Sequence, residues 1–443
     1  MRDAIGVAAG RVVQWLLRVR GGKGSGAPGL VTNRIAPGLL PRVLDSFPQG
    51  LVVVSGTAGK STTTKMVAAL LSDHGLRVFT NSSTANLPQG ITSAVLDEGD
   101  WRGRVTADIA VLEMDEAFGA KIAQMYRARV VTLTNINLDD IARFESYERV
   151  IRLLTTVAER STQAVVLNAD DASLSRVAAA VETGATGAAV RRFGVSAEVM
   201  HDQPYGLGYV RTEPTRLSRA EGTVVASVQG RDAVITQPAA QGAGPDAAEV
   251  SLDVTLPARG VHFAVDAAAA LETAREVLGA DYDAARAAQT LSTLEPVFGR
   301  GETVEIQGQR IECLLVQNTA SFQLNIDAMG SARERVFLGV CDAEEDTSWL
   351  WTVHTESLGH VDIVGGPKAD AMANRLAYDG VPFGQVDTDL IRAFEAFLAL
   401  PPPAEGIKTV VFTSRSMRKI RGHYGLTSAE VRAKGARRKA GAP

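Results

Sequence analysis

The chain has 443 residues, 45% hydrophobic and 22% charged, a composition that excludes a disordered or fibrous protein. Lysine and arginine number 46 against 50 acidic residues, so we expect no nucleic-acid partner, because such proteins carry a basic surplus. The two cysteines, Cys313 and Cys341, lie outside any metal-binding motif, which argues against disulfides and zinc and fits a reducing cytoplasm.

Residues 1–48 are expected to form an N-terminal appendage. An amphipathic helix from Ile5 to Val19 is predicted, with Ile5, Ala9, Val12, Leu16 and Leu17 on one side and Arg11, Gln14 and Arg18 on the other. It is too short and too charged to span a bilayer, and no cleavable signal is evident. We expect its apolar side to dock on another surface, with a membrane-surface helix as the alternative. A glycine-rich turn at 21–29 and a proline-marked connection follow, ending near Pro48.

Residues 49–296 are predicted to form a central α/β domain. A buried strand at 51–55 is followed by a glycine loop, a helix at 63–74 and a strand at 77–80. Further strands are expected at 109–112, 130–133 and 164–167, alternating with helical segments. This alternation predicts a mostly parallel sheet covered by helices on both faces. A β-rich insertion is expected at about 195–258, followed by helices at 265–278 and 284–291.

Residues 297–430 are predicted to form a second α/β domain, with strands at 313–316, 336–340, 361–364 and 409–413. The last residues, 431–443, read as a basic solvated tail, with weak attraction to anionic lipid as the alternative.

The strongest chemical signal is VVVSGTAGKSTTT at residues 52–64, placed after a buried strand and before a helix. Backbone N–H groups of the loop from Gly56 through Thr57, Ala58 and Gly59, and the helix start at Thr62, would face phosphate. Lys60 would neutralise the β- and γ-phosphates, and the Ser61 hydroxyl would complete a Mg²⁺ shell. The sequence therefore predicts binding of a nucleotide together with Mg²⁺.

This shortened loop resembles that of the Mur ligase family, which joins amino acids or ammonia to a carboxylate through an acyl phosphate. Three further segments agree: VLEMDE with Glu113 resembles the family's metal-binding glutamate, TLTNIN with Asn135 its strand-end asparagine, and FGRGE with Arg300 its hinge arginine. VLNADD at 166–171 is similar to another family segment. The resemblance implies that Asn135 and Arg300 bind ATP and that Glu113 holds Mg²⁺.

Within the family, the chain is most similar to the MurT group, the ligase subunits of lipid II isoglutaminyl synthase. The similar segments are NSSTANLPQGI at 81–91, VQNTASFQ at 316–323, DTSWLW at 346–351 and GGPKADAMANRLAYDGV at 365–381. In them we take Thr84 as a further metal-ligand candidate, and Asn86 and Asn318 as substrate-contact candidates.

The MurT resemblance implies amidation of the α-carboxylate of D-glutamate in lipid II, with ammonia supplied by a class-I glutamine amidotransferase subunit similar to GatD. It implies that Asp346 completes the Cys-His pair of that partner, a carboxylate that fixes the tautomer of an imidazole. A helix N-cap is the alternative role for Asp346. We expect a cytoplasmic protein, and we keep open a peripheral contact with the inner face of the membrane.

Several residues depart from the MurT pattern. Residues 138–143 (LDDIAR) lack three of its side chains, Gln317 replaces a lysine, Thr319 a proline and Ser321 a glycine, and Asp266 stands where Mur ligases carry asparagine. The zinc ribbon of many MurT chains is absent, because no cysteine lies between residues 197 and 258. Two alternatives therefore stay open: a Mur-type ligase acting on another carboxylate, and a non-catalytic nucleotide-binding scaffold for the amidotransferase.

Other polar residues are expected to be structural. The six histidines, at 74, 201, 262, 354, 360 and 423, show no ligand spacing. Asp170 and Asp171 are interpreted as a helix cap rather than a metal site, and Trp349 and Trp351 as core or interface aromatics.

Overall fold

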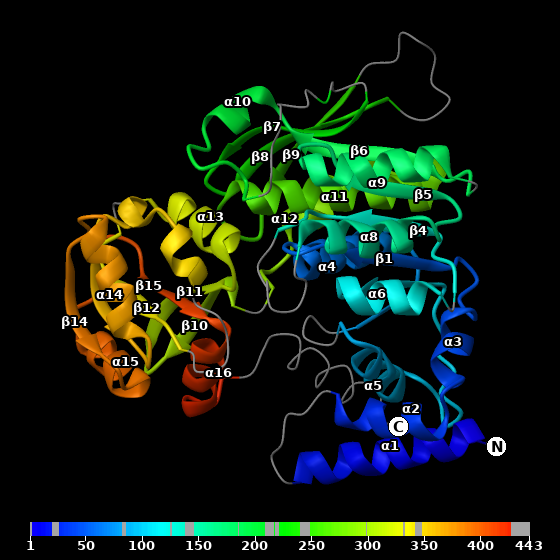
Figure 1. Cartoon of the computed structure of the whole chain (residues 1–443), viewed down its shortest axis with the longest axis horizontal. Coiled ribbons are helices and arrows are strands. Elements are labelled where there is room, and N and C mark those ends of the chain that lie inside the picture. Colours follow the sequence, from blue (N-terminus) through cyan, green and yellow to red (C-terminus); the bar gives the residue numbers. More distant parts are fainter. Residues whose placement is uncertain are drawn as a thin grey trace.

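A computed structural model shows two α/β units, each built on one sheet (Figure 1). It describes residues 2–19, 26–81, 86–124, 126–137, 146–184, 186–208, 217, 221–239, 249–297, 299–330, 333–341 and 348–426. The predicted α/β class is confirmed. The expected tail at 431–443 lies outside the described residues.

The first sheet has nine strands in the order β2-β3-β1-β4-β5-β6-β7-β8-β9. Its strands are β1 (Leu51–Ser55), β2 (Val78–Thr80), β3 (Ile109–Glu113), β4 (Val130–Leu133), β5 (Ala164–Asn168), β6 (Ala189–Val195), β7 (Gly222–Gln229), β8 (Asp232–Gln237) and β9 (Val250–Thr255). Pairing is parallel from β2 through β7 and antiparallel from β7 to β9.

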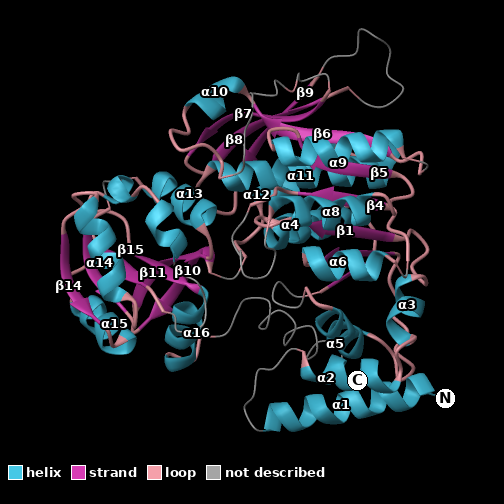
Figure 2. Cartoon of the chain, in the orientation of Figure 1, coloured by secondary structure: helices cyan, strands magenta, loops and turns pink. Residues whose placement is uncertain are grey.

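Helices cover both faces of this sheet, as Figure 2 shows. They are α4 (Lys60–Asp73), α5 (Pro88–Glu98), α6 (Glu116–Ala123), α8 (Tyr147–Ala158), α9 (Ala172–Thr183), α10 (Ala197–His201), α11 (Val261–Leu278) and α12 (Ala284–Ser292), with a 3-10 turn η1 (Gly279–Asp281). Strand β1 alternates between two cores: Val53 joins the apolar cluster under α6, α8 and α9, while Val52 and Val54 join the cluster under α4, α11 and α12. Each face of the central strand is therefore fully buried.

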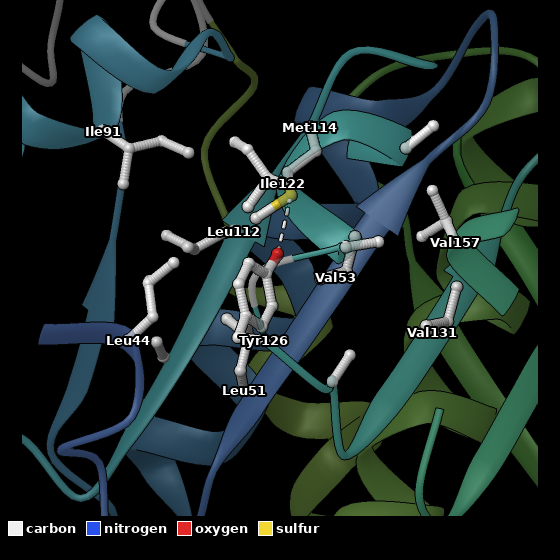
Figure 3. Packing of buried hydrophobic residues seen from close by; sticks show 14 of the residues in the cluster. Leu44, Leu51, Val53, Ile91, Leu112, Met114, Ile122, Tyr126, Val131 and Val157 are labelled. Atoms are coloured by element: carbon white, nitrogen blue, oxygen red, sulfur yellow. Dashed lines mark hydrogen bonds between the residues drawn. The ribbon is translucent and has the colours of Figure 1, made fainter. Parts of the chain in front are cut away.

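Figure 3 shows the first of these cores. Val53 and Leu112, from two adjacent strands, lie beside Tyr126, whose hydroxyl donates a hydrogen bond to Met114 Sδ at 3.1 Å. The buried phenol thus has a partner for its one polar atom, which keeps the cost of burying it low.

The predicted β-rich insertion is present as strands β7, β8 and β9 of the first sheet. These strands continue the edge of the sheet beyond β6 by main-chain pairing, starting with the register Arg192↔Gly222. Alternating segments indicated the strands but not which neighbour they pair with, because that pairing is non-local. Residues 209–216, 218–220 and 240–248 of this region lie outside the described residues.

The N-terminal residues are also better integrated than expected. The structure has α1 (Arg2–Val19), α2 (Ala27–Ile35) and α3 (Leu39–Leu44), where the sequence suggested one helix and a connection. Val7, Leu40 and Leu44 are buried in the same core as β1, so this segment is not an appendage. The predicted orientation of α1 is wrong as well: Ile5, Val12 and Leu16 are exposed.

The second sheet has six strands in the order β10-β11-β15-β12-β13-β14. Its elements are β10 (Arg300–Ile306), β11 (Gln309–Val316), α13 (Thr319–Met329), β12 (Val336–Gly339), η2 (Ser348–Thr352), η3 (Thr355–Leu358), β13 (Val361–Gly365), α14 (Ala369–Tyr378), β14 (Phe383–Asp387), α15 (Leu390–Ala399), β15 (Lys408–Thr413) and α16 (Ser414–His423). Only β10 is antiparallel to its neighbour. The four predicted strands are present, whereas β10 and β14 were not predicted.

The predicted boundary near residue 297 falls between α12 and β10, and the domain limits given above remain predictions. Within the part of the chain that the structure describes, none of the helices has the length and apolar character needed to cross a membrane.

Candidate active site

The loop between β1 and α4 has a backbone that only glycine permits at two positions. Gly56 and Gly59 have φ of 124° and 81°, in the region that L side chains rarely adopt. A Cβ on Gly56 would lie 2.4 Å from Thr134 Oγ1, and one on Gly59 would lie 2.2 Å from Asp266 Oδ1. The two glycines thus let the loop pass close to Thr134 and Asp266. The loop then leads into the N-terminus of α4, where the helix dipole favours an anion.

The end of β4 fixes the shape of this loop. Asn135 Oδ1 accepts a hydrogen bond from Ala58 N at 2.9 Å, and its Nδ2 donates to Ala58 O at 3.2 Å. Its backbone carbonyl accepts from Thr57 N at 3.0 Å. Asn135 thus contacts the loop from both ends of its side chain and positions the loop's backbone.

Lys60, the first residue of α4, folds back over the loop. Its Nζ donates to the carbonyl oxygens of Gly56 and Thr57, the latter at 2.9 Å, and lies 3.4 Å from Glu116 Oε1. The side chain is only 13% exposed. The ammonium group is therefore held at the mouth of the loop, beside the space that a phosphate would take.

Ser61 and Glu113 form a pair of oxygens beside Lys60. Ser61 Oγ donates to Glu113 Oε2 at 2.7 Å, and Asn86 Nδ2 donates to Glu113 Oε1 at 3.4 Å. Burial raises the pKa of Glu113, while Lys60 and the Ser61 hydrogen bond oppose that rise.

This pair fits a magnesium ion. Mg²⁺ usually takes one or two protein oxygens and completes its octahedral shell with phosphates and water. Among the described residues there is no cluster of three or more histidines, cysteines or acids that could hold a metal alone. A magnesium ion bound jointly by Ser61, Glu113 and the phosphates of a nucleotide is consistent with that finding.

A cavity adjoins the loop where the two sheets face each other. Its lining includes Ala58, Gly59 and Asp266 from the first unit and Arg300, Leu315 and Asn325 from the second. It holds about 90 Å³ of free space beside the phosphate loop.

Two buried groups in the cavity wall are neutral near pH 7. Burial raises the pKa of Asp266 to about 8, although Thr63 Oγ1 donates to its Oδ1 at 3.2 Å. Burial lowers the pKa of His262 to about 4, with the Arg300 charge adding to the effect. A protonated Asp266 carries one donor and one acceptor, as the asparagine of other Mur-type sequences would.

Two segments of the chain match families of known proteins. Residues 54–232 match the family described as Mur ligase middle domain, and residues 315–404 match the family described as MurT ligase C-terminal. Both units are thus similar to Mur ligases, and the chain is an enzyme of the ligase class.

One relative matches most of the chain. The MurT subunit of lipid II isoglutaminyl synthase of Streptococcus pneumoniae is 26% identical to it, over 86% of this chain and 88% of that subunit. The corresponding subunit of Staphylococcus aureus is 25% identical over 41% of each chain. MurF ligase from Thermotoga maritima, solved in complex with ADP, matches the fold with a TM-score of 0.62 at 18% identity, covering 88% of this chain and 82% of that one.

The structure brings many of the predicted site residues together around the loop between β1 and α4. The loop residues, Lys60, Ser61, Glu113, Asn86 and Asn135 surround the mouth of the loop. Arg300 lies across the cavity, with its Nη2 3.5 Å from Gln317 Oε1. Thr84, Asp346 and the segment 138–143 lie outside the described residues.

Asn318 lies at the start of α13 and caps it. Its Oδ1 accepts from Ser321 N at 2.8 Å, and Ser321 Oγ accepts from Asn318 N at 3.1 Å, the reciprocal pattern of a capping box. Asp171 likewise caps α9 as expected, and accepts from Ile136 N at 2.6 Å. The predicted substrate contact of Asn318 remains a prediction.

Sequence reasoning missed Glu116 and the position of His262. Glu116 follows the predicted metal glutamate by three residues, a spacing that puts it in the first turn of α6, near Lys60. His262 lines the cavity and its ring stacks at an angle on Phe263, with centroids 4.3 Å apart. A histidine in the first turn of a buried alanine-rich helix was the available signal, but it is equally typical of a structural residue.

Proposed function

We propose that this chain is the ATP-dependent subunit that amidates the α-carboxylate of D-glutamate in the lipid II stem peptide. The product would be D-isoglutamine. Ammonia would come from glutamine, hydrolysed by a partner glutamine amidotransferase of the GatD type.

The observation that carries this proposal is the combination of two features in one chain. A phosphate-binding loop holds Lys60 and the Ser61–Glu113 pair together, and residues 315–404 match the MurT ligase C-terminal family. The first feature supports phosphoryl transfer from ATP, and the second favours a ligase of the MurT type.

The proposed reaction has two steps. A carboxylate oxygen of the acceptor attacks the γ-phosphorus, the bond to ADP breaks, and an acyl phosphate forms. Ammonia then attacks the acyl carbon, phosphate leaves with the bonding electron pair, and the nitrogen loses a proton. Lys60 and the backbone of the loop would stabilise negative charge on the transferring group, so positioning and electrostatics supply the catalysis.

Mg²⁺ would be held by Ser61 and Glu113 and would neutralise phosphate charge when bound. Asn135 would keep the loop in its binding shape, and Arg300 would bring positive charge to the nucleotide from the second unit. A neutral Asp266 would avoid repelling the phosphates from beneath Gly59, the glycine whose Cβ position its carboxyl borders.

The direct test supplies the chain with lipid II, Mg²⁺, ATP and ammonium, and follows the acceptor by mass spectrometry. We expect conversion of the D-glutamate carboxyl to a carboxamide that requires ATP. Free ammonium removes the need for the partner, so the ligase half is tested alone. No conversion with ammonium or with an added amidotransferase, despite ATP binding, would overturn the assignment.

The same assay tests the two alternative functions, a Mur-type ligase that acts on another carboxylate and a non-catalytic nucleotide-binding scaffold for the amidotransferase. Gln317 stands where the MurT pattern has lysine, and it contacts Arg300, which favours a changed acceptor as the second candidate. A panel of other cell-wall carboxylates separates this candidate from the first. ATP binding without turnover on every acceptor, with the amidotransferase present, would indicate the scaffold.

The partner role is tested by Asp346→Asn. If Asp346 supports the imidazole of the amidotransferase, the variant should lose glutamine-driven amidation by at least about 10²-fold while ammonium-driven amidation stays within a factor of about two. Asp370→Asn, at an exposed site on α14, is the matched control. Equal loss with both nitrogen donors would point to a defect in folding instead.

A further inference from the structure

Helix α1 presents its large apolar side chains outward. Those of Ile5, Val12, Trp15, Leu16 and Val19 are 52%, 57%, 61%, 44% and 66% exposed. With Ala8, which is also exposed, they fall within an arc of about 100° at 100° per residue. The helix thus has one continuous apolar stripe, which we call the α1 stripe: Ile5, Ala8, Val12, Trp15, Leu16 and Val19.

Val7 together with small and polar residues, rather than the α1 stripe, attaches α1 to the protein. A Cβ on Gly10 would lie 2.1 Å from Thr32 Oγ1 of α2, and one on Gly6 would lie 2.8 Å from Ala36 Cβ. Arg11 donates to the carbonyls of Leu96 and Gly99, at the end of α5. An ordinary amphipathic helix buries its apolar side, so the reversed orientation of α1 calls for an external surface that covers the stripe.

The stripe lies in a cationic segment of an acidic protein. Residues 1–44 contain seven of the 46 lysines and arginines of the chain and one of its 50 acidic residues. Arg2 and Arg18 are exposed on α1 itself, and Arg34 is exposed on α2. This sign of charge fits an anionic surface, and a basic helix with one apolar stripe is typical of helices that lie flat in a membrane interface.

Two exposed tryptophans strengthen that assignment. Trp15 is part of the α1 stripe, and Trp101 is 59% exposed with Arg102 stacked over its ring at 4.2 Å. Arg11 also donates to Asp100 O, which places the turn carrying Trp101 beside α1. Tryptophan and arginine together are typical of the headgroup level of a bilayer.

We propose that the α1 stripe docks this protein on an anionic phospholipid bilayer. Figure 1 shows α1 at the edge of the molecule, with α2 and α5 on its inner side. A second copy of this surface would bring like charges together. The chain's own residues 427–443 are a poor cover, because Val431 is their one large apolar residue and their surplus of charge is also positive.

The test measures binding of the full-length chain to vesicles, without nucleotide, acceptor or partner, so it is independent of the amidation assay. Vesicles are made of phosphatidylcholine alone or mixed with phosphatidylglycerol. We expect cosedimentation with the mixed vesicles, weakened by salt, and a blue shift of tryptophan fluorescence. Val12→Glu with Leu16→Glu should lower the partition coefficient at least about tenfold, because two apolar side chains no longer enter the bilayer.

Tyr378→Glu, at an 81% exposed aromatic of the second unit, is the matched control and should bind as the wild type does. Trp15→Ala with Val19→Ser gives a second, milder pair if the glutamate pair does not fold, as judged by circular dichroism and Tm. Wild-type protein that stays in the supernatant of anionic vesicles at low salt would overturn the proposal. So would glutamate variants that bind undiminished, or a wild-type dimer that those variants convert to monomer without any vesicle binding.

Discussion

Two helices begin at the cleft between the sheets, and they begin differently. Helix α4 follows β1 through Gly59 in a left-handed conformation, and among the described residues no side chain caps it. Helix α13 follows β11 through Asn318, whose side chain and that of Ser321 form a complete capping box. The same strand-to-helix connection is therefore left open to a ligand in one unit and closed by the protein in the other.

This difference shows that a helix N-terminus becomes an anion site only when the chain withholds its own acceptors. At α13, an amide oxygen already takes the place where a phosphate oxygen would bind. At α4, the glycines admit a ligand and Lys60 supplies charge. Changes at the two helix starts should consequently affect different properties, catalysis at one and stability at the other.

The largest expected effect is that of Lys60→Ala. Removing the ammonium group should lower ATP-dependent amidation by at least about 10³-fold with either glutamine or ammonium, because charge on the transferring phosphoryl group loses its nearest cation. Steady-state rates with both nitrogen donors measure it. Lys121→Ala, at an exposed position on α6, should leave the rates unchanged. Turnover near the wild-type rate in the Lys60 variant would show that the start of α4 takes no part in the reaction.

Glu113→Gln should have the next largest effect, on the metal. The amide keeps an oxygen near Ser61 but loses the negative charge, so the Mg²⁺ concentration needed for half-maximal activity should rise about 10- to 100-fold. A Mg²⁺ titration of the rate measures it, with Glu148→Gln on the surface of α8 as the control. An unchanged titration curve would mean that the metal binds elsewhere.

Asp266→Asn should alter the pH dependence of stability. The carboxyl has a pKa near 8 when folded and near 3.8 when exposed, so between these values the folded protein binds the extra proton. Its contribution to the free energy of unfolding therefore falls as pH rises from about 4 to 8.

The measurement is Tm by calorimetry at pH 5 and pH 8. The wild type should lose at least about 4 °C more than the asparagine variant over this range. Asp370→Asn should follow the wild-type curve. Parallel curves for wild type and the Asp266 variant would show that this carboxyl does not hold its proton in the fold.

The smallest expected effect is that of Asn318→Ala. Loss of the cap should cost about 1 kcal/mol and lower Tm by about 2–4 °C, while the ammonium-driven rate stays within twofold of wild type. Thermal unfolding and steady-state rates are measured on the same sample. A large loss of activity at unchanged Tm would instead support the predicted contact between Asn318 and the substrate, and would weaken the contrast between α4 and α13.

Local patterns were sufficient to predict the phosphate loop and most strands of both sheets. The run LVVVS was expected as a strand and is one, because four consecutive apolar residues suit a strand buried on both faces. The loop pattern predicted Ser61 as a magnesium ligand and the Mur ligase resemblance implied the same role for Glu113, and the structure places the two side chains in hydrogen-bond contact.

What the sequence did not reveal was which surfaces face each other. The period of α1 separates apolar from polar residues, but it does not say which side turns inward, and here glycine and arginine contacts outweigh the apolar side. The pairing of β6 with β7 and the contact between Lys60 and Glu116 are also long-range in the chain. Such contacts depend on packing between elements, which periodicity and propensity do not encode.

Helix α11 carries a consequence for how the chain folds during synthesis. Fifteen of its 18 residues are buried, between α4 on one side and strands β4 to β7 on the other. Until residue 278 has left the ribosome, the face of the sheet that α4, α11 and α12 cover has only α4 of these three helices on it. At about 5–20 residues per second, that interval after β1 lasts roughly 10–45 s. The open sheet would be a target for chaperones during this time, and substitutions that weaken α11 would reduce the yield of folded protein more than the stability of what has folded.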